Sequence, residues 1–99
     1  MALRVVQWAT GGVGVAAIKG VLDHPELELV GCWVHSEAKS GKDVGELIGG
    51  RALGVIATNS VDEILALDAD AVIYSPLMPN PDEVTALLRS GKNVVTPVG

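Results

Sequence analysis

The residues best suited to chemistry form a glycine-rich segment near the amino terminus, Ala9-Thr10-Gly11-Gly12-Val13-Gly14. The segment matches the GxGxxG pattern of a phosphate-binding turn, except that alanine stands at the first glycine position. The second glycine lets a pyrophosphate approach the backbone, and the third lets a helix lie close to a strand. We expect the N–H groups of Gly12 and Val13 to point at the phosphates from the positive end of a helix. Ala9 is expected to keep a negative φ, because a Cβ disfavours the left-handed region.

A second polar group lies where an NAD-binding domain usually places an acid, about 20 residues after the last glycine of the turn. The chain reads Val34-His35-Ser36 at that place, with no acid at the expected strand end. Ser36 and Lys39 can donate hydrogen bonds to a 2′-phosphate that a carboxylate would repel, which favours NADP over NAD. Glu37 keeps NAD open, since a shift of one or two residues in the strand boundary brings a carboxylate to the ribose. A solvated loop without a binding role is nearly as good an interpretation of the segment that contains Ser36 and Lys39. His35 is expected to stack on adenine or to have a purely structural role.

Further candidates follow two later strands. Ser75 and Pro76 come directly after one apolar run and Thr96 ends another. Ligands of open α/β sheets lie beyond the carboxyl ends of the strands, so we expect these residues to flank the nicotinamide ribose. None of them is an obvious acid, base or nucleophile, and we therefore assign no catalytic residue.

These candidates must be positioned by alternating strands and helices. Apolar runs predict strands at 3–8, 27–34, 55–58, 71–74 and 93–96, and helical spacing, caps and glycines predict helices at 13–22, 44–48, 61–67 and 81–90. Alternation of this kind predicts a Rossmann-type, doubly wound parallel sheet in the order 3-2-1-4-5. Residues 1–99 then form one dinucleotide-binding domain that is truncated after the fifth strand. The exposed fifth strand predicts self-association.

Composition narrows the function classes. The net charge is −5 and the seven Lys and Arg residues are scattered, so a nucleic-acid partner is not expected. Cys32 stands alone, which excludes an internal disulfide or a thiolate metal site and favours a reducing cytoplasm. The sequence contains no pattern of a signal peptide or a membrane span.

The chain resembles the amino-terminal domain of dihydrodipicolinate-reductase-like proteins, particularly the diaminopentanoate dehydrogenase and native amine dehydrogenase branch. The resemblance runs from Arg4 to Gly99. It is carried by the segment from Val6 to Gly14, by Val34-His35-Ser36 followed by Gly41-Lys42-Asp43-Val44-Gly45-Glu46-Leu47, and by Ser90-Gly91-Lys92-Asn93-Val94-Val95-Thr96-Pro97. The family typically has Gly in place of Ala9.

This resemblance implies an NAD(P)-dependent oxidoreductase that forms or reduces C=N bonds. It also implies a carboxyl-terminal domain that supplies the contacts to an amine or imine substrate and a dimer surface, so residues 1–99 alone are expected to be inactive. By resemblance the pyrophosphate belongs with Thr10, Gly11, Gly12 and Val13, and the ribose with Ser36 and Lys39.

Three alternatives stay open at this point. The first is a stand-alone NAD(P)-binding or redox-sensing module without catalysis. A sensor would need an output segment, and the sequence shows none outside the expected fold, which speaks against this alternative. The second is a cofactor domain of the homoserine dehydrogenase or sugar dehydrogenase type. Those families have a sequence similar to residues 91–96, but the residues that follow it there differ from those of this chain. The third, a methyltransferase-like fold, conflicts with the glycine spacing at residues 9–14.

Overall fold

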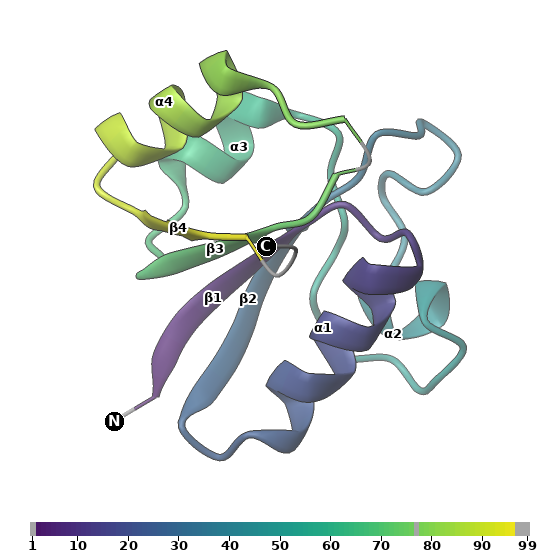
Figure 1. Ribbon diagram of the computed structural model, residues 1–99. Coiled ribbons are helices and arrows are strands. Elements are labelled where there is room, and N and C mark those ends of the chain that lie inside the picture. Colours follow the sequence, from purple (N-terminus) through teal and green to yellow (C-terminus); the bar gives the residue numbers. More distant parts are fainter. Residues whose placement is uncertain (1, 77, 97–99) are drawn as a thin grey trace.

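A computed structural model describes residues 2–76 and 78–96, without the side chains of Gly12 and Val13. It has a parallel sheet with helices on both faces (Figure 1). The strands are β1 (Leu3–Trp8), β2 (Leu27–Trp33), β3 (Ala71–Tyr74) and β4 (Asn93–Val95), and the helices are α1 (Gly12–Asp23), α2 (Val44–Leu47), α3 (Val61–Ala66) and α4 (Pro81–Arg89). The predicted fold class, a Rossmann-type α/β domain, is confirmed.

The strands lie in the order β2-β1-β3-β4, all parallel. This is the expected order without its outermost member, because the predicted strand at 55–58 is not formed in the described residues. Only Thr58 pairs with β2, through bonds to Cys32 and Val34. Its neighbours instead turn away to pair antiparallel with the segment before α2, where Ala57 N donates to Lys42 O at 2.8 Å. The prediction of a full strand at 55–58 is therefore wrong, whereas the strand predicted at 93–96 forms as β4.

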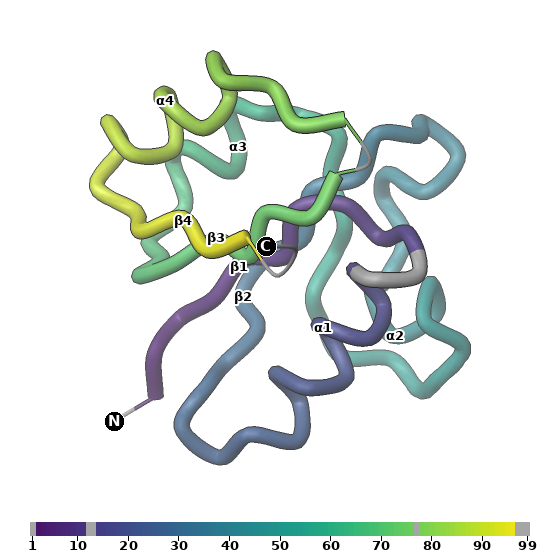
Figure 2. Tube along the Cα trace, viewed as in Figure 1, coloured from purple at the N-terminus to yellow at the C-terminus, as the bar shows by residue number. Residues whose placement is uncertain are grey.

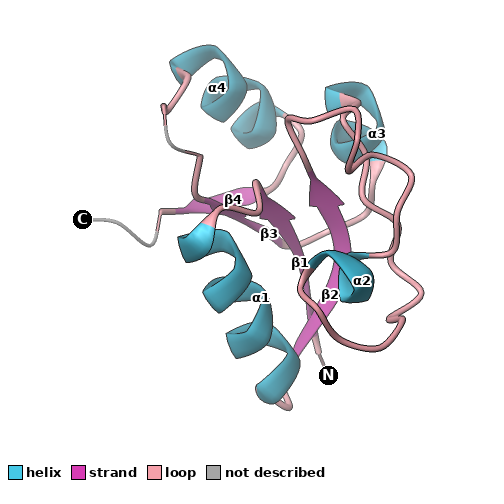
Figure 3. Cartoon of the chain, turned by 90° about the vertical axis from the view of Figure 1, so that its right-hand side faces the viewer, coloured by secondary structure: helices cyan, strands magenta, loops and turns pink. Residues whose placement is uncertain are grey.

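The two faces of the sheet carry different cores. α1 and α2 cover one face, and α3 and α4 cover the other, as Figure 1 and the turned view in Figure 3 show. The first core is aliphatic apart from one cysteine, and its buried members are Val5, Ile18, Val21, Leu29, Cys32, Val34, Val44 and Ala57. The second holds every aromatic residue of the chain except the two histidines, and its buried members are Val6, Trp8, Trp33, Ile64, Val72, Tyr74 and Leu87. We call these the aliphatic face and the aromatic face.

Capping side chains fix where the shorter helices begin. The Ser60 hydroxyl accepts from Glu63 N at 3.3 Å, and Asn80 Oδ1 accepts from Asp82 N at 2.9 Å. Asp43 does more, because its carboxylate accepts from Gly45 N (2.7 Å), Leu53 N (2.8 Å) and Gly54 N (2.8 Å). One side chain thus closes the loop that carries α2.

Candidate functional site

The turn between β1 and α1 lies at the carboxyl edge of the sheet. The tube in Figure 2 shows the chain leaving β1 and entering α1 within a few residues. Gly11 is the N-cap of α1, has no side chain to cap it, and is followed by no acid in the first turn. The positive end of a 12-residue helix is therefore neither capped by a side chain nor neutralised by an acid of its own first turn. Gly12 and Val13 belong to that turn, and only their backbone lies in the described part of the structure.

Ala9 corrects one expectation, because its φ is +82°. The left-handed conformation costs a residue with a Cβ about 1–2 kcal/mol. Two hydrogen bonds hold it: Ala9 N donates to Trp33 O at 2.8 Å, and Ala9 O accepts from Gln7 Nε2 at 2.9 Å. The chain must leave the strand and enter the helix within this turn, so the backbone takes the sharp conformation although no glycine is present.

Gly14 and Gln7 also stabilise the β1 turn, through their contacts with Ala9. A Cβ at Gly14 would collide with the Ala9 carbonyl and lie 3.2 Å from Gln7 Nε2, so only glycine lets α1 start this close to β1. Gln7 is fully buried, and its Nε2 also donates to Ser75 Oγ at 2.7 Å. This amide joins the ends of β1 and β3 beneath the turn. Sequence reasoning missed Gln7, although a lone amide in an apolar strand was a visible signal.

The segment after β2 approaches the turn from the other side. Lys39 Nζ donates to Thr10 Oγ1 at 3.2 Å, across 29 positions of sequence. Ser36 is half-buried, and its Oγ accepts from Ala38 N at 3.1 Å, which shapes the loop. Glu37 is exposed. A cation therefore stands beside the β1 turn, whereas sequence reasoning had placed Lys39 at the ribose 2′-phosphate.

A cavity of about 460 Å³ opens beyond the carboxyl ends of the strands. Its walls come from the β1 turn, the end of β2 and the segment leading into α4, and they comprise Ala9, Trp33, His35, Pro76, Met78, Asn80 and Glu83. Trp33 stacks on Trp8 with ring centroids 4.4 Å apart and planes 13° from parallel, and the Trp8 ring lies 5.9 Å from Tyr74. The aromatic face thus continues directly into a mostly apolar wall of the cavity.

One hydrogen-bonded group ties this cavity to the aromatic face. The Tyr74 hydroxyl donates to Glu83 Oε1 at 2.8 Å and accepts from Asn80 N at 2.8 Å. Burial raises the pKa of Tyr74 above its usual 10, and the Glu83 carboxylate raises the pKa of that hydroxyl further. The phenol therefore stays protonated and holds the carboxylate at the cavity wall.

The remaining candidates divide between the turn and the sheet edge. Ser75 is half-buried, and its hydroxyl donates to Trp8 O at 3.3 Å, so it takes part in the support of the turn. Pro76 lies in the cavity with Trp33 and His35. Thr96 is exposed after β4, and no hydrogen bond joins it to the described part of the chain.

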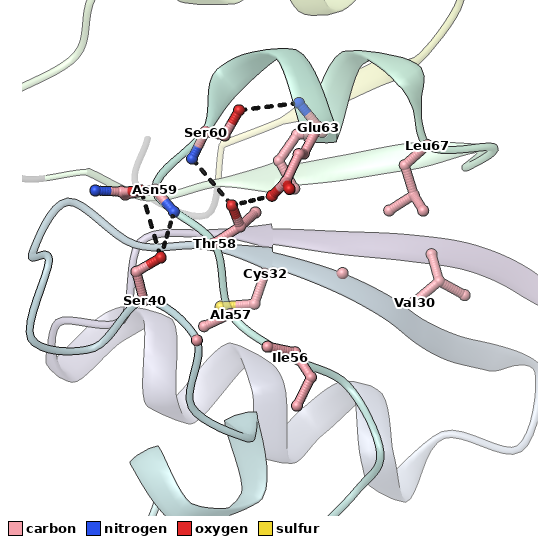
Figure 4. Close-up of a pocket in the computed structure, with 13 residues that line it drawn as sticks. Val30, Cys32, Ser40, Ile56, Ala57, Thr58, Asn59, Ser60, Glu63 and Leu67 are labelled. Carbon is pink, nitrogen blue, oxygen red and sulfur yellow. Dashed lines mark hydrogen bonds between the residues drawn. The ribbon is translucent and has the colours of Figure 1, made fainter.

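A larger cavity of about 510 Å³ lies along the outer edge of β2 (Figure 4). Its polar lining is bonded internally: Asn59 N donates to Ser40 Oγ at 3.1 Å, and the Thr58 hydroxyl donates to Glu63. Cys32 lines it too, and burial raises the pKa of that thiol to about 12. The lining includes no residue of the β1 turn, and it contains Ile56, Ala57 and Thr58 of the segment that was predicted to be a strand.

Two classes of site find no support in the described residues. Residues 2–76 and 78–96 contain no group of three His, Cys, Asp or Glu side chains placed to hold a metal ion. No helix in these ranges is long and apolar enough to cross a membrane.

Comparison with known proteins finds a matching family and relatives that are named as a dehydrogenase and a reductase. The sequence profile described as dihydrodipicolinate reductase, N-terminus, matches residues 5–96. An amine dehydrogenase of Streptomyces virginiae is 43% identical over 96% of this chain and 28% of its own length. A 4-hydroxy-tetrahydrodipicolinate reductase of Synechocystis sp. is 36% identical over 64% of this chain and 23% of its own length.

A solved structure agrees with these sequence relatives. The amine dehydrogenase of Mycobacterium smegmatis superposes with a TM-score of 0.87 at 27% sequence identity, over 97% of this chain and 30% of that one. The chain therefore spans less than a third of the length of each relative named here.

Proposed function

The chain belongs to the family of dihydrodipicolinate reductase amino-terminal domains, and we propose that it holds the adenosine half of NADP for an oxidoreductase that acts on C–N bonds. One observation carries this proposal: the β1 turn leads into the uncapped N-terminus of α1, its Ala9 lines a cavity walled by Trp33, and Lys39 stands at the turn. Phosphate and base sites of the required kinds thus lie side by side.

Each part of the dinucleotide has a matching part of the site. The pyrophosphate belongs at the first turn of α1, next to Gly11, where uncapped N–H groups and the helix dipole favour an anion. The adenine belongs in the cavity beyond β2, between the Trp33 side and the segment entering α4. This assignment moves Pro76 from the nicotinamide side to the adenine side. Ser75 and Thr96 keep their place nearer the nicotinamide, whose ring supplies the hydride.

The 2′-phosphate belongs with Ser36 and Lys39. The Lys39 ammonium reaches Thr10 at the turn, so it lies on the side of its loop that faces the proposed pyrophosphate site. Charge-assisted hydrogen bonds of this type favour NADP over NAD by about tenfold to a hundredfold in affinity. Glu37 is exposed in the same loop and is the residue that would bind the ribose of NAD instead.

Calorimetric titration of NADP and NAD tests this assignment. Lys39→Ala is expected to weaken NADP binding while leaving NAD nearly unchanged, and Ser36→Asp to reverse the preference, because a carboxylate repels the phosphate and accepts from ribose hydroxyls. Lys42→Ala is the matched control, since Lys42 is exposed in the same loop. Equal affinities for both cofactors, unmoved by Lys39→Ala, would assign the ribose to Glu37 or to the backbone.

The whole protein is proposed to be an amine dehydrogenase or a related C=N reductase, with an amine or imine substrate bound by residues outside this domain. The relatives support this, because the domain covers 28% of the Streptomyces amine dehydrogenase. Residues 1–99 alone are expected to bind cofactor without turnover, since catalysis needs a substrate held beside the nicotinamide. Turnover of an imine with NADPH by the purified domain would contradict this. A homodimer in the cytoplasm remains part of the proposal, and sedimentation of the protein tests its association.

A further inference from the structure

The cavity beyond β2 contains one carboxylate, Glu83, among walls that are otherwise apolar or uncharged apart from His35. Glu83 lies in the first turn of α4 and is half-buried. An acid at this end of a helix is stabilised in its ionised form by the helix dipole. An ionised carboxylate only accepts hydrogen bonds, so the cavity presents a fixed acceptor to whatever occupies it.

Tyr74 fixes which oxygen of Glu83 is available. Its hydroxyl donates to Oε1 at 2.8 Å, and in the described ranges no donor reaches Oε2 within hydrogen-bonding distance. Tyr74 is itself held by Asn80 N, at 2.8 Å, and by its buried ring beside Trp8. The carboxylate therefore has one oxygen hydrogen-bonded to Tyr74 of the aromatic face, and its other oxygen has no partner in the described ranges and is left for a ligand donor.

Asn80 adds a donor on the same wall. Its Oδ1 accepts from Asp82 N at 2.9 Å as the N-cap of α4, so the amide nitrogen Nδ2 is the end that remains for a ligand. The wall thus offers one acceptor from Glu83 and one donor from Asn80. Adenine presents the complementary pair on one edge, with the exocyclic amine as donor and ring N1 as acceptor.

We propose that Glu83 is the residue that selects a 6-aminopurine base in this cavity, by accepting a hydrogen bond from the exocyclic amine, with Tyr74 as its positioning residue. This inference rests on the proposed dinucleotide function. A 6-oxopurine places a carbonyl oxygen where the amine would be, and that oxygen faces a carboxylate without a proton between them.

The test compares NADP with its hypoxanthine analogue, which differs only at the 6-position of the base. The wild-type protein is expected to bind NADP at least about tenfold more tightly. Glu83→Gln keeps the side-chain shape and the oxygen that accepts from Tyr74, but it can turn an amide N–H toward the oxo group. The ratio of the affinity for NADP to that for the analogue is therefore expected to fall toward one. Tyr74→Phe is expected to lower the ratio partially, because it frees the carboxylate without removing it.

Asp82→Asn is the matched control, since Asp82 lies in the same helix turn and does not line the cavity. It makes the same change of charge and is expected to leave the ratio as in the wild type. A wild-type ratio near one, or a ratio that Glu83→Gln leaves unchanged, overturns the role of Glu83 while the dinucleotide function stands. Failure of both nucleotides to bind the folded wild-type protein overturns the proposed function itself.

Discussion

The two faces of the four-stranded sheet differ in the side chains that cover them. On the aliphatic face, branched side chains such as Ile18 and Val21 from α1 fill the space against β1 and β2. On the aromatic face, Trp8 and Trp33 stack at 4.4 Å, and both indole Nε1 atoms are buried without a hydrogen-bond partner among the described residues. Leaving a buried donor unsatisfied costs about 1–3 kcal/mol. The aromatic face thus carries this cost, and Trp33 does so where it forms a cavity wall.

The largest expected effect tests whether the aliphatic face serves stability only. Ile18→Ala removes a fully buried side chain of α1 and is expected to lower the free energy of unfolding by about 2–5 kcal/mol, through lost burial and the cavity left behind. Chemical denaturation measures this. The folded fraction should bind NADP with unchanged affinity, and a weakened affinity would break the division between the faces.

Trp33→Leu tests whether the aromatic face contributes to nucleotide binding. The change removes an aromatic wall of the cavity and is expected to weaken NADP binding by about tenfold, because base stacking on an aromatic ring is worth about 1–3 kcal/mol. Titration of the folded variant measures it. Trp33→Phe keeps an aromatic ring and should recover much of the affinity, whereas equal losses in both variants would point to a packing defect.

Ala9→Gly sharpens the comparison at the edge where the aromatic face meets the β1 turn. Relief of the left-handed strain, about 1–2 kcal/mol, exceeds the entropy of about 0.4–1 kcal/mol that glycine adds to the unfolded chain. We expect a net gain of about 0.5–1 kcal/mol in the free energy of unfolding. Ala38→Gly, at an exposed position without a positive φ, serves as the control and should not stabilise the protein. A destabilised Ala9→Gly variant would show that the turn carries no strain.

Asp43 gives the smallest effect, on the loop that covers the aliphatic face. The hydrogen bond from Leu53 N, together with those from Gly45 and Gly54, holds the pKa of Asp43 below its usual 3.8. A lowered pKa in the folded state stabilises the fold above pH 3.8, and this contribution is lost as the pH falls below that value.

Thermal melts between pH 2 and 7 measure the contribution of Asp43. Asp43→Asn should lower the melting temperature at neutral pH and flatten its fall at acid pH. Asp23→Asn changes an exposed acid at the end of α1 and is the control. The same pH dependence in the Asp43→Asn variant and in wild type would assign the acid sensitivity to other carboxylates.

Local signals in the sequence predicted most of the elements and the turn. The cap at Ser60, the Asn80-Pro81 start of α4 and the glycine run after Trp8 act within a few residues, so their outcome could be predicted from the chain alone. The strand predicted at 55–58 does not form because the backbone of Lys42 and Val44, distant in the sequence, hydrogen-bonds to Ala57 and Val55 instead. Side-chain placement in the site depended on such distant contacts as well.

Three features of the site could not be predicted from the sequence for that reason. The φ of Ala9 is set by bonds to Trp33 and Gln7, and the contact of Lys39 with Thr10 bridges two loops. The role of Glu83 required knowing that Tyr74 ends β3 beside the start of α4. Sequence reasoning predicted candidate residues for a phosphate site but did not predict the wall of the cavity.

The tryptophan stack also determines what light can report about this domain. The domain contains two tryptophans, Trp8 and Trp33, and both belong to the same stacked pair. Emission excited at long ultraviolet wavelengths therefore originates at the carboxyl edge of the sheet, and exciton coupling between the two indoles gives a circular dichroism signal that depends on their mutual angle. The aliphatic face has no such chromophore and is spectroscopically silent. A nucleotide entering the cavity would change the optical signal without any label, whereas loosening of α1 would leave it unchanged until the sheet itself came apart.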